Sequence, residues 1–396
     1  MINNFNIYNK LYNLFFLSFK IGKGLIIWLN NGLYIKNIII KILLNLYNKS
    51  NYFLVESPHI GLNNMYIISG HYLKYKKNFF NFYKKSNYYL KPMNCPHHCY
   101  IYKYLKPKLP FRIIEYSYIY RYEKSGELKN IFRSRSFIQD DCHIFCKKKH
   151  INHEINIIFK HILYIFKIFN FNKFKVILSI KNDSDKYINN KYWNYSQNIL
   201  LNFLINKKIK FNIIKGEAAF YGPKIDFMVK DLLGKYWQLS TIQLDYNLPI
   251  NFNLNHKKKI IIIHRALLGS FERFIGLILE NNNNNLPIWL SIIHLSIIPI
   301  NIKFLKFSQK IKNYFFKKIN IIIKLYNNFK KNLNFYIKKS ELKKIPFILV
   351  IGEKEYKKKK FILRCRNKKY KFFKNIKLLL LYIKYKINIP LYDRKN

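Results

Sequence analysis

The chain has 396 residues, enough for two domains with sizeable hydrophobic cores. Half of its residues are hydrophobic, which excludes an intrinsically disordered protein. Its 72 Lys and Arg against 19 Asp and Glu give a formal net charge of +53, which favours a polyanionic partner such as nucleic acid. The chain is also crowded with Lys, Asn, Ile, Phe and Tyr, the residues of A- and T-rich codons. We therefore attribute most of the charge to drift in base composition.

Cysteine usage and hydropathy indicate the compartment. Five cysteines in a lysine-rich chain without an evident secretory signal favour a reducing environment. The apolar run from Leu11 to Phe19 has no small-residue cleavage site after it, so we interpret it as part of an amphipathic first helix. The most apolar region, Pro287 to Pro299, is shorter than the roughly 18 residues of a membrane span. We expect no membrane span and a cytoplasmic location, as in a bacterial symbiont, with an organellar matrix as the alternative.

The first half of the chain alternates between helical and extended patterns. Residues 1–50 predict a helix, a turn and a second helix. Val55–Pro58 is typical of the end of a strand. Residues 111–146 alternate strongly and predict a long antiparallel hairpin with Ser125 near its loop, and a helix is expected over residues 150–169.

The second half predicts more strands, a helix and a separate domain. Residues 216–246 are strand-like with Gly and Pro breaks, and we expect His264 to open a helix. One stripe of that helix is apolar and consists of Leu267, Phe271, Phe274 and Ile278. A second stripe carries small residues and one arginine: Ala266, Gly269, Ser270 and Arg273. Residues 280–285 end in consecutive asparagines and predict a linker, which divides the chain into domains 1–285 and 286–396.

Three distant residues predict a zinc site. Cys95, His143 and His264 are zinc-type ligands whose spacing is too wide for a small zinc finger. It suits a site assembled from separate parts of one domain. Three protein ligands leave a fourth position open, as in a zinc that binds substrate.

The hairpin carries an unusual polar face. If residues 137–145 form a strand, one face presents Phe137, Gln139, Asp141, His143 and Phe145, which is not a core pattern. Arg121 and Glu123 are expected to share a face of the facing strand in the same way. Arg133 and Arg135 lie between the strands, where arginines could clamp phosphates. The alternative is a solvated sheet surface with ion pairs.

The cysteines allow a different metal site. Cys95 with Cys99, and Cys142 with Cys146, could form a structural four-cysteine zinc site. Geometry weighs against it, because four residues of a strand span roughly 13 Å. Two thiolates on one zinc ion lie within about 4 Å of each other.

A second polar group follows in the chain. The glycine-bounded segment Gly216–Asp226 presents Tyr221 and Lys224, which alone is weak evidence for a site. Gln238 and Gln243 have opposite parity on the next strand. A bulge near residues 240–241 would be needed to direct both side chains to one place.

Together these segments resemble the threonyl-tRNA synthetases, a family of class II aminoacyl-tRNA synthetases. The match runs from about residue 20 to 275 and continues more weakly to the C-terminus. The most specific segments are Met93–Pro96, Arg121–Cys146, Gly216–Asp226 and His264–Gly276. The resemblance implies an α+β fold with an antiparallel class II sheet flanked by helices, followed by a small α/β anticodon-binding domain.

The resemblance also implies a role for each matching residue. The matching metal ligands, for one Zn²⁺ per chain, are Cys95, His143 and His264. The catalytic arginines, which contact the phosphates of ATP, are Arg121, Arg133 and Arg273. The remaining ATP-binding residues are Glu123, Phe137 and Gln238. The threonine-binding residues are Gln139, Asp141, Tyr221, Lys224 and Gln243.

The implied activity is threonine–tRNA ligase, with ATP and Mg²⁺, threonine and threonine tRNA as partners. The resemblance implies a homodimer with Pro58 at its interface, and anticodon contacts from Glu355 and Arg364. Members of the family usually carry N-terminal domains, one of which hydrolyses seryl-tRNA. The class II core begins almost at Met1 here, so we expect no editing domain in cis.

Departures from the family pattern concern specificity. His97 and Cys99 stand where a glycine and an apolar residue are usual, and Ser240 stands where glycine is expected in the threonine pocket. One alternative is a class II synthetase for serine, proline or glycine, against which the Cys/His/His set argues. Another is a degenerate tRNA-binding paralogue without catalysis, against which the three arginines argue. A purely structural zinc protein fits less well, because the ligands sit among phosphate-binding residues.

Overall fold

The computed structural model describes residues 4–80, 87–182, 190–254, 259–282, 285–366 and 369–393. Contacts divide the chain into two units. The smaller consists of the N-terminal residues up to Leu14, Leu29–Ile42 and Asn282–Leu391; the larger consists of Phe15–Trp28, Leu43–Asn281 and the residues from Tyr392 on. The expected boundary between residues 285 and 286 stays a prediction.

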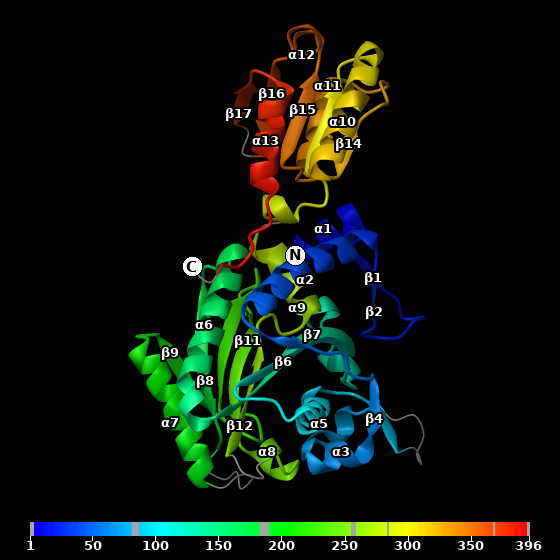
Figure 1. Ribbon diagram of the computed structural model, residues 1–396. Helices are drawn as coiled ribbons and strands as arrows, with labels where there is room; N and C mark the ends of the chain where they lie inside the picture. Colours follow the sequence, from blue (N-terminus) through cyan, green and yellow to red (C-terminus); the bar gives the residue numbers. More distant parts are fainter. Residues whose placement is uncertain are drawn as a thin grey trace. The chain divides into compact units, whose positions relative to one another are not determined.

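A mixed, mainly antiparallel sheet forms the centre of the larger unit (Figure 1). In the part of the chain that the structure describes, it has eight strands in the order β3-β6-β7-β12-β11-β10-β8-β9. They are β3 (Phe53–Leu54), β6 (Phe111–Tyr120), β7 (Ser136–Lys147), β8 (Phe174–Ile180), β9 (Phe211–Lys215), β10 (Lys224–Lys230), β11 (Tyr236–Asp245) and β12 (Ile260–Ala266). The edge pairs β3–β6 and β8–β9 are parallel, and the pairs between them are antiparallel. The α+β prediction is confirmed.

The predicted hairpin is present. Strands β6 and β7 pair antiparallel from Phe111 opposite Phe145 to Tyr120 opposite Ser136. The loop between them contains two short 3-10 helices, η2 (Ser125–Glu127) and η3 (Asn130–Phe132). The expectation that Arg121 and Glu123 lie on the facing strand is wrong, because β6 ends at Tyr120 and both residues belong to the start of the loop.

Helices cover one face of this sheet. They include α6 (Ile151–Ile168), as predicted, with α7 (Asn190–Asn206) and α9 (Phe271–Asn281) (Figure 1). Aromatic rings fill the contact: Phe166 lies against Phe227 of β10, and Phe169 of the α6 end lies 4.8 Å from Phe274 of α9. Since neighbours in a strand point to opposite faces, Asp226 beside Phe227 points to the other face, which holds the polar residues.

The expectation that His264 opens a helix is wrong. His264 belongs to β12, and α9 begins only at Phe271. The preceding run of four isoleucines, Ile260–Ile263, is buried, and β-branched residues of this kind favour a strand covered on both faces. Gly269, with a φ of +66°, turns the chain between strand and helix.

The N-terminal part differs in detail from the prediction. Helix α1 (Asn4–Tyr12) is followed by a hairpin of β1 (Phe15–Leu17) and β2 (Ile26–Trp28), and then by α2 (Asn30–Lys49). The apolar run from Leu11 to Phe19 is therefore not one helix. The predicted strand end at Val55 is nearly right, because β3 ends at Leu54.

The remaining elements of the larger unit lie between or beside these strands. They are β4 (Ile60–Leu62), α3 (Asn63–Ile68), α4 (His71–Tyr75), η1 (Lys76–Asn78), β5 (Tyr88–Leu90), α5 (Cys95–Leu105), η4 (Lys148–His150) and α8 (Asn247–Asn251). Strands β4 and β5 pair antiparallel with each other.

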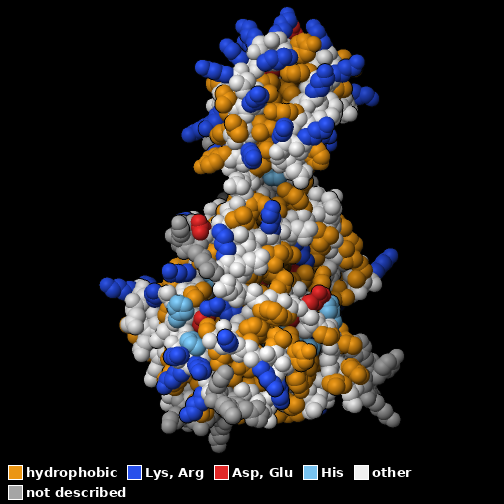
Figure 2. All heavy atoms as spheres, viewed as in Figure 1, with side chains coloured by type: hydrophobic (Ala, Val, Ile, Leu, Met, Phe, Trp, Pro, Cys, Tyr) orange, Lys and Arg blue, Asp and Glu red, His pale blue; other side chains and the backbone are white. Residues whose placement is uncertain are grey.

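The smaller unit has the α/β character predicted for the second domain. Its sheet has the order β14-β13-β15-β16-β17, in which β13 pairs parallel with β14 and β15. The strands are β13 (Leu295–Pro299), β14 (Ile323–Leu325), β15 (Phe347–Ile351), β16 (Phe361–Cys365) and β17 (Tyr370–Phe373). The helices are η5 (Ile288–Leu290), η6 (Ile302–Phe304), α10 (Leu305–Ile319), α11 (Leu333–Leu342), α12 (Glu353–Lys358) and α13 (Ile376–Ile387). Figure 2 shows Lys and Arg side chains spread over the surface of the α10–α13 region, with few acidic ones on that face.

Membrane-spanning helices were searched for in the described ranges. None of the helices found there combines the length and the apolar character needed to cross a bilayer.

A buried ion pair fastens the end of β12 to β7. The guanidinium of Arg265, only 1% exposed, lies 3.4 Å from the carboxylate of Asp140 and donates to the hydroxyl of Tyr47. Asp140 also accepts the backbone N–H groups of Leu267 and Leu268. The carboxylate thus holds the chain that leads from the strand to α9.

Replacing this carboxylate should destabilise the larger unit strongly. Asp140→Ala leaves the Arg265 charge buried without its partner, which costs about 3–5 kcal/mol in free energy of unfolding. Urea denaturation measures the change. The control Glu217→Ala removes an exposed carboxylate and should leave the midpoint nearly unchanged. Equal midpoints for the two variants would contradict the structural role of Asp140.

Candidate functional site

The three predicted zinc ligands meet at one point. Cys95 is the first residue of α5, and His143 of β7 lies directly opposite His264 of β12 in the antiparallel register. One ligand atom from each residue lies within 4.8 Å of the others, and all three side chains are buried. The Sγ of Cys95 is 3.6 Å from Nδ1 of His264, and the two imidazole rings are 4.5 Å apart at their centroids.

The donor set fits a zinc ion. One thiol and two imidazoles match the N and S ligands that zinc prefers. The Nε2 atom of His143 is buried without a hydrogen-bond partner, which is costly unless a further group binds there. Burial lowers the pKa of His143 well below its ordinary value, so the ring is neutral and able to ligate. Among the described residues, this is the group that could hold a metal ion; Cys142 and Cys146 do not join it.

A carboxylate orients His264. Its Nε2 atom lies 2.8 Å from Oδ2 of Asp245, so Nδ1 faces Cys95. The other oxygen of Asp245 accepts the backbone N–H groups of Asn247 and Leu248 at the start of α8. A carboxylate behind a ligating histidine fixes the ring and raises its basicity.

A polar cavity of about 510 Å³ adjoins the three ligands. Cys95 and His264 belong to its wall. The predicted substrate residues that also line it are Arg121, Glu123, Arg133, Phe137, Gln139, Asp141, Tyr221, Gln238, Gln243 and Arg273. The small-residue stripe expected near α9 lines it too, through Ala266, Gly269, Ser270 and Arg273. A cation at the three ligands would therefore face the cavity.

Three guanidinium groups give the cavity its charge. Arg273 donates to the backbone carbonyls of Phe132 and Gln238. Burial, together with the positive charges of Arg121 and Arg133, lowers the pKa of Arg273 to about 10. The mutual repulsion of the arginines would be relieved by a polyanion such as a nucleotide triphosphate.

The other two arginines also have neighbours in the cavity. Arg133 forms an ion pair of 2.7 Å with Glu123 and a longer one with Glu127. The guanidinium of Arg121 lies 5.4 Å from the centroid of the Phe137 ring. The Phe137 ring and the Glu123 carboxylate therefore lie next to arginines that could bind phosphates, which is an arrangement suited to a nucleotide.

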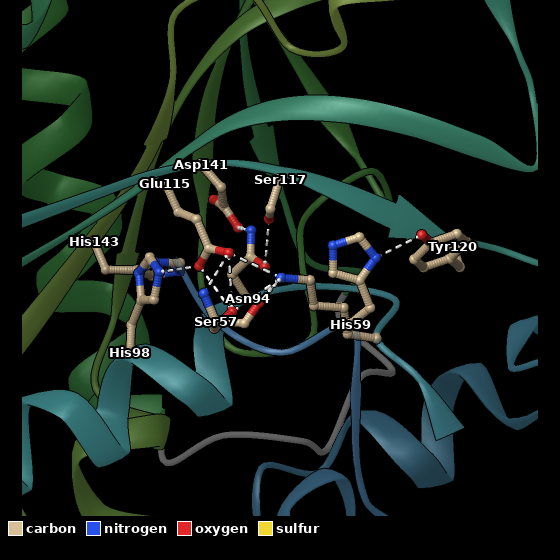
Figure 3. Close-up of polar contacts among 10 residues, drawn as sticks. Ser57, His59, Asn94, His98, Glu115, Ser117, Tyr120, Asp141 and His143 are labelled. Carbon is tan, nitrogen blue, oxygen red and sulfur yellow. Dashed lines mark hydrogen bonds and ion pairs between the residues drawn. The ribbon is translucent and has the colours of Figure 1, made fainter. Parts of the chain in front are cut away.

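The residues predicted to bind threonine form hydrogen bonds beside the three candidate metal ligands. Tyr221 donates to Oε1 of Gln243 at 2.6 Å, and its ring stacks on His264. Asp141 accepts a hydrogen bond from the amide of Asn94, which in turn accepts one from Ser117 (Figure 3).

Lys224 is placed differently from the other residues predicted to bind threonine. It forms an ion pair with Asp226 and is not part of the cavity wall. The carboxylate of Asp226 also accepts from the amide of Gln238. Lys224 thus lies beside the site and is tied to it through Asp226.

The bulge expected in β11 is present, one residue earlier than predicted. Strand β10 pairs Phe227 with Ser240 but Met228 with Gln238, which leaves Leu239 as the extra residue. This shift lets Gln238 and Gln243 line the same cavity despite their opposite parity.

Two residues of the site were missed from the sequence. His71 lines the cavity, and burial lowers its pKa to about 3, so the imidazole is neutral. The Ser69-Gly70-His71 turn was the available signal, since Gly70 has a φ of +79° and Ser69 contacts the ring. The other is Asn94, fully buried behind Asp141, which lies inside the motif that supplies Cys95.

The three departures from the family pattern lie outside the cavity wall. Ser240 is fully buried, and its hydroxyl donates to the carbonyl of Leu267. Cys99 packs in an apolar cluster with Phe145. Nε2 of His97 faces Gly61 of β4.

The two anticodon candidates lie in the smaller unit. Glu355 accepts the backbone N–H of Gly352 and so caps α12. Arg364 of β16 contacts Glu341 and donates to the hydroxyl of Tyr370 at 2.8 Å. Glu355 therefore has a structural use of its own, whereas the Arg364 and Tyr370 pair lies on the sheet surface.

Comparison with known proteins agrees with this arrangement. Residues 79–282 match the tRNA synthetase class II core domain (G, H, P, S and T), and residues 294–381 match an anticodon binding domain. The chain is 30% identical to the RNA binding domain of threonyl-tRNA synthetase from Cryptosporidium parvum Iowa II, with a TM-score of 0.90 and both chains covered completely. The chain belongs to the threonyl-tRNA synthetase family.

Further members of this family show the same likeness. The threonine–tRNA ligase of Azobacteroides pseudotrichonymphae is 41% identical over 321 residues, which cover 77% of this chain and 50% of that protein. The ligase of Bacteroides fragilis is 40% identical over 327 residues. A putative threonyl-tRNA synthetase of Aeropyrum pernix is 25% identical with a TM-score of 0.84 and covers 97% of this chain and 96% of that chain. The chain spans about half the length of the curated relatives it matches. The family resemblance predicted from the sequence is confirmed.

Two cysteines of helix α5, Cys95 and Cys99, allow a controlled test of the metal site. Cys95→Ala removes one of three ligands and should abolish stoichiometric zinc binding, measured by elemental analysis after dialysis. Cys99→Ala removes a buried thiol from the same helix, four residues away and outside the ligand group, and should leave zinc content unchanged. Zinc retained in full by the Cys95 variant would contradict the site.

Proposed function

We propose that the protein is a threonine–tRNA ligase that forms threonyl-adenylate from threonine and ATP and transfers threonine to its tRNA. The observation that carries this proposal is the common wall of one cavity, which holds the ligands Cys95 and His264 as well as Arg121, Arg133 and Arg273. A soft-donor metal site beside a nucleotide-type site serves activation of an amino acid that can itself ligate the metal.

Selection of threonine follows from this chemistry. A bound zinc ion, held by Cys95, His143 and His264, would supply coordination for the amino and hydroxyl groups of threonine. Asp141, held by Asn94, would accept a hydrogen bond from the substrate. Valine lacks the hydroxyl and would leave these groups unpaired, which costs roughly 10⁴-fold in specificity. Serine keeps the hydroxyl and loses one methyl group, so we expect discrimination of only about 10–200-fold.

The chain's own residues would then direct the reaction. The threonine carboxylate would attack the α-phosphate of ATP and displace pyrophosphate, and Arg121 would stabilise the negative charge that develops. Arg133 and Arg273 would hold the other phosphates together with Mg²⁺, with Phe137 and Glu123 at adenine and Gln238 nearby. Gln139, Tyr221 and Gln243 would orient the threonine from the cavity wall, and Lys224, paired with Asp226, would act from beside the site. The tRNA ribose hydroxyl would then attack the threonyl carbonyl of the adenylate and release AMP, so no protein nucleophile is needed.

The smaller unit would bind the anticodon. Its basic surface favours tRNA, and such binding weakens steeply with salt (Figure 2). Glu355 and Arg364 are the candidate contacts. Because the curated relatives are bacterial-type threonine–tRNA ligases, we propose the cytoplasm as the location, with an organelle as the alternative.

Two other functions remain alternatives. A synthetase for serine, proline or glycine would leave the Cys95, His143 and His264 group without a use. A tRNA-binding paralogue without catalysis would leave the repelling arginines of the cavity without a use. Threonine activation employs both clusters.

The proposal is tested by ATP–pyrophosphate exchange with each amino acid in turn. Threonine should stimulate exchange most, serine about 10–200-fold less in kcat/KM, and valine not detectably. Arg273→Ala should lower the threonine rate by about 10²–10³-fold, as loss of a charge-stabilising donor does. Exchange that depends on another amino acid, or tRNA binding without any exchange, would instead support one of the alternatives.

We also propose a homodimer that forms at the edge of the large sheet. Strand β3 is an edge strand, and its Phe53 and Leu54 are about half exposed, as are Ile60 and Leu62 of β4. Exposed apolar side chains beside an unpaired strand edge favour association. Pro58 lies exposed between the two strands.

Sedimentation equilibrium at micromolar concentration should give twice the chain mass of 48.3 kDa. The double variant Leu54→Lys, Leu62→Lys should sediment as a monomer, because it puts charge into the apolar surface. Ile205→Lys, at an equally exposed position of α7, serves as the control and should stay dimeric. A monomeric wild-type chain would refute the proposed interface.

A further inference from the structure

A second histidine stands directly behind the ligand His143. Nδ1 of His143 lies 2.7 Å from Nδ1 of His98, and the two rings meet at 90° with their centroids 4.7 Å apart (Figure 3). His98 is fully buried on α5, one turn after Cys95. The contact uses Nδ1 of His143, which leaves Nε2, buried and without a hydrogen-bond partner, available for a metal ion.

The other ring nitrogen of His98, Nε2, contacts a carboxylate. Nε2 of His98 lies 3.0 Å from Oε2 of Glu115, which is fully buried on β6. The other oxygen, Oε1, accepts from Nζ of Lys91 at 2.8 Å and from the backbone N–H of Ser57 at 3.0 Å. The ammonium of Lys91 and the N–H and hydroxyl donors of Ser57 stabilise the charged form of Glu115 without any contribution from a charge on His98. The carboxylate is therefore ionised and accepts on both oxygens.

The proton positions follow from this chain of contacts. An ionised Glu115 only accepts, so Nε2 of His98 must carry a hydrogen. The ammonium of Lys91 already balances the carboxylate charge, so His98 need not be charged. A neutral His98 then has a lone pair on Nδ1 and accepts the Nδ1–H of His143. In that tautomer, Nε2 of His143 has its lone pair free for a metal ion.

We propose that His98 is a positioning residue for the metal site, which fixes His143 as the Nδ1–H tautomer with Nε2 directed at the ion, and that Glu115 and Lys91 set this state. The proposal deepens the proposed function and rests on its zinc site. The reverse arrangement, in which His98 donates to His143, would put a hydrogen on Nε2 of His143 and block ligation. Partners of this kind typically contribute about 10–100-fold in metal affinity.

The neighbouring His97 provides the matched control. It belongs to the same helix but faces Gly61 of β4, away from the metal ligands. Burial lowers the pKa of His97 to about 4, so its imidazole is neutral near pH 7. A variant of His97 thus tests whether loss of any imidazole from α5 disturbs the site.

The substitution Glu115→Gln distinguishes an effect of hydrogen-bond direction from an effect of packing. The side-chain oxygen of the substituted amide must stay toward Lys91 and the Ser57 N–H, since both only donate there. The NH₂ group of the amide then faces His98 and donates, which forces the hydrogen of His98 onto Nδ1. That hydrogen points at Nδ1 of His143 and moves the His143 hydrogen to Nε2. The variant keeps the volume of Glu115 and reverses the relay.

The experiment measures tautomers in the full chain labelled with ¹⁵N-histidine, without metal, with resonances assigned by single histidine substitutions. The wild-type chain should have His143 protonated at Nδ1 and bare at Nε2, and Glu115→Gln should reverse this. A His143 protonated at Nε2 in the wild-type chain would overturn the proposal without reference to any variant. So would an unchanged tautomer in a folded Glu115→Gln chain, with folding followed by circular dichroism.

Chelator competition then measures zinc affinity. His98→Leu and Glu115→Gln should each weaken zinc binding by about 10–100-fold, and His97→Leu should change it by less than about threefold. Equal losses for His97→Leu and His98→Leu would show that packing, and not the relay, matters. Failure of the wild-type chain to bind zinc would contradict the proposed function instead, and the tautomer measurement on metal-free protein is independent of it.

Discussion

The whole site depends on the alternation of side chains in one antiparallel sheet. Strand register brings His143 of β7 opposite His264 of β12, and His264 opposite Gln243 of β11. Because paired residues point to the same face, the candidate metal ligands His143 and His264 and the candidate threonine-binding residue Gln243 form one row across three strands. A shift of one residue in any of these strands would turn its polar side chains into the helices on the other face.

Buried carboxylates, each bonded to several donors, fix the strands and histidines of the site. Asp140 and Arg265 fix the passage from β12 to α9 on the helical side of the sheet. On the site side, Asp245 behind His264 and Glu115 behind His98 hold the imidazoles. Each carboxylate has several donors, as burial of a charge requires. These contacts hold the candidate metal ligands beside the three arginines of the cavity.

Much of the site could be predicted because its residue types are wrong for a core. The alternation of Phe137, Gln139, Asp141 and His143 predicted a polar strand face, and three of these residues line the cavity while His143 joins the metal ligands. The bulge in β11 followed from the opposite parity of Gln238 and Gln243 once both were assigned to one site, and it lies one residue earlier than predicted. The helix expected at His264 was wrong because the four preceding isoleucines are equally typical of a buried strand, and only pairing with both neighbours decides between them.

What the sequence could not reveal is which side chains behind the ligands connect to them. His98, Glu115 and Lys91 lie on separate elements, and a single chain contains no signal of their contact. Lys224 and Tyr221 were both predicted to bind threonine, yet Lys224 forms an ion pair with Asp226 and lies outside the cavity wall. Partner choice among polar groups is a property of the assembled sheet.

X-ray absorption at the zinc edge reports the donors of the bound ion. We expect one sulfur donor at about 2.3 Å and two imidazole nitrogens at about 2.0–2.1 Å, with a spectrum that changes when threonine is added and not when valine is added. A shell of several sulfur donors, or a spectrum indifferent to threonine, would contradict this expectation.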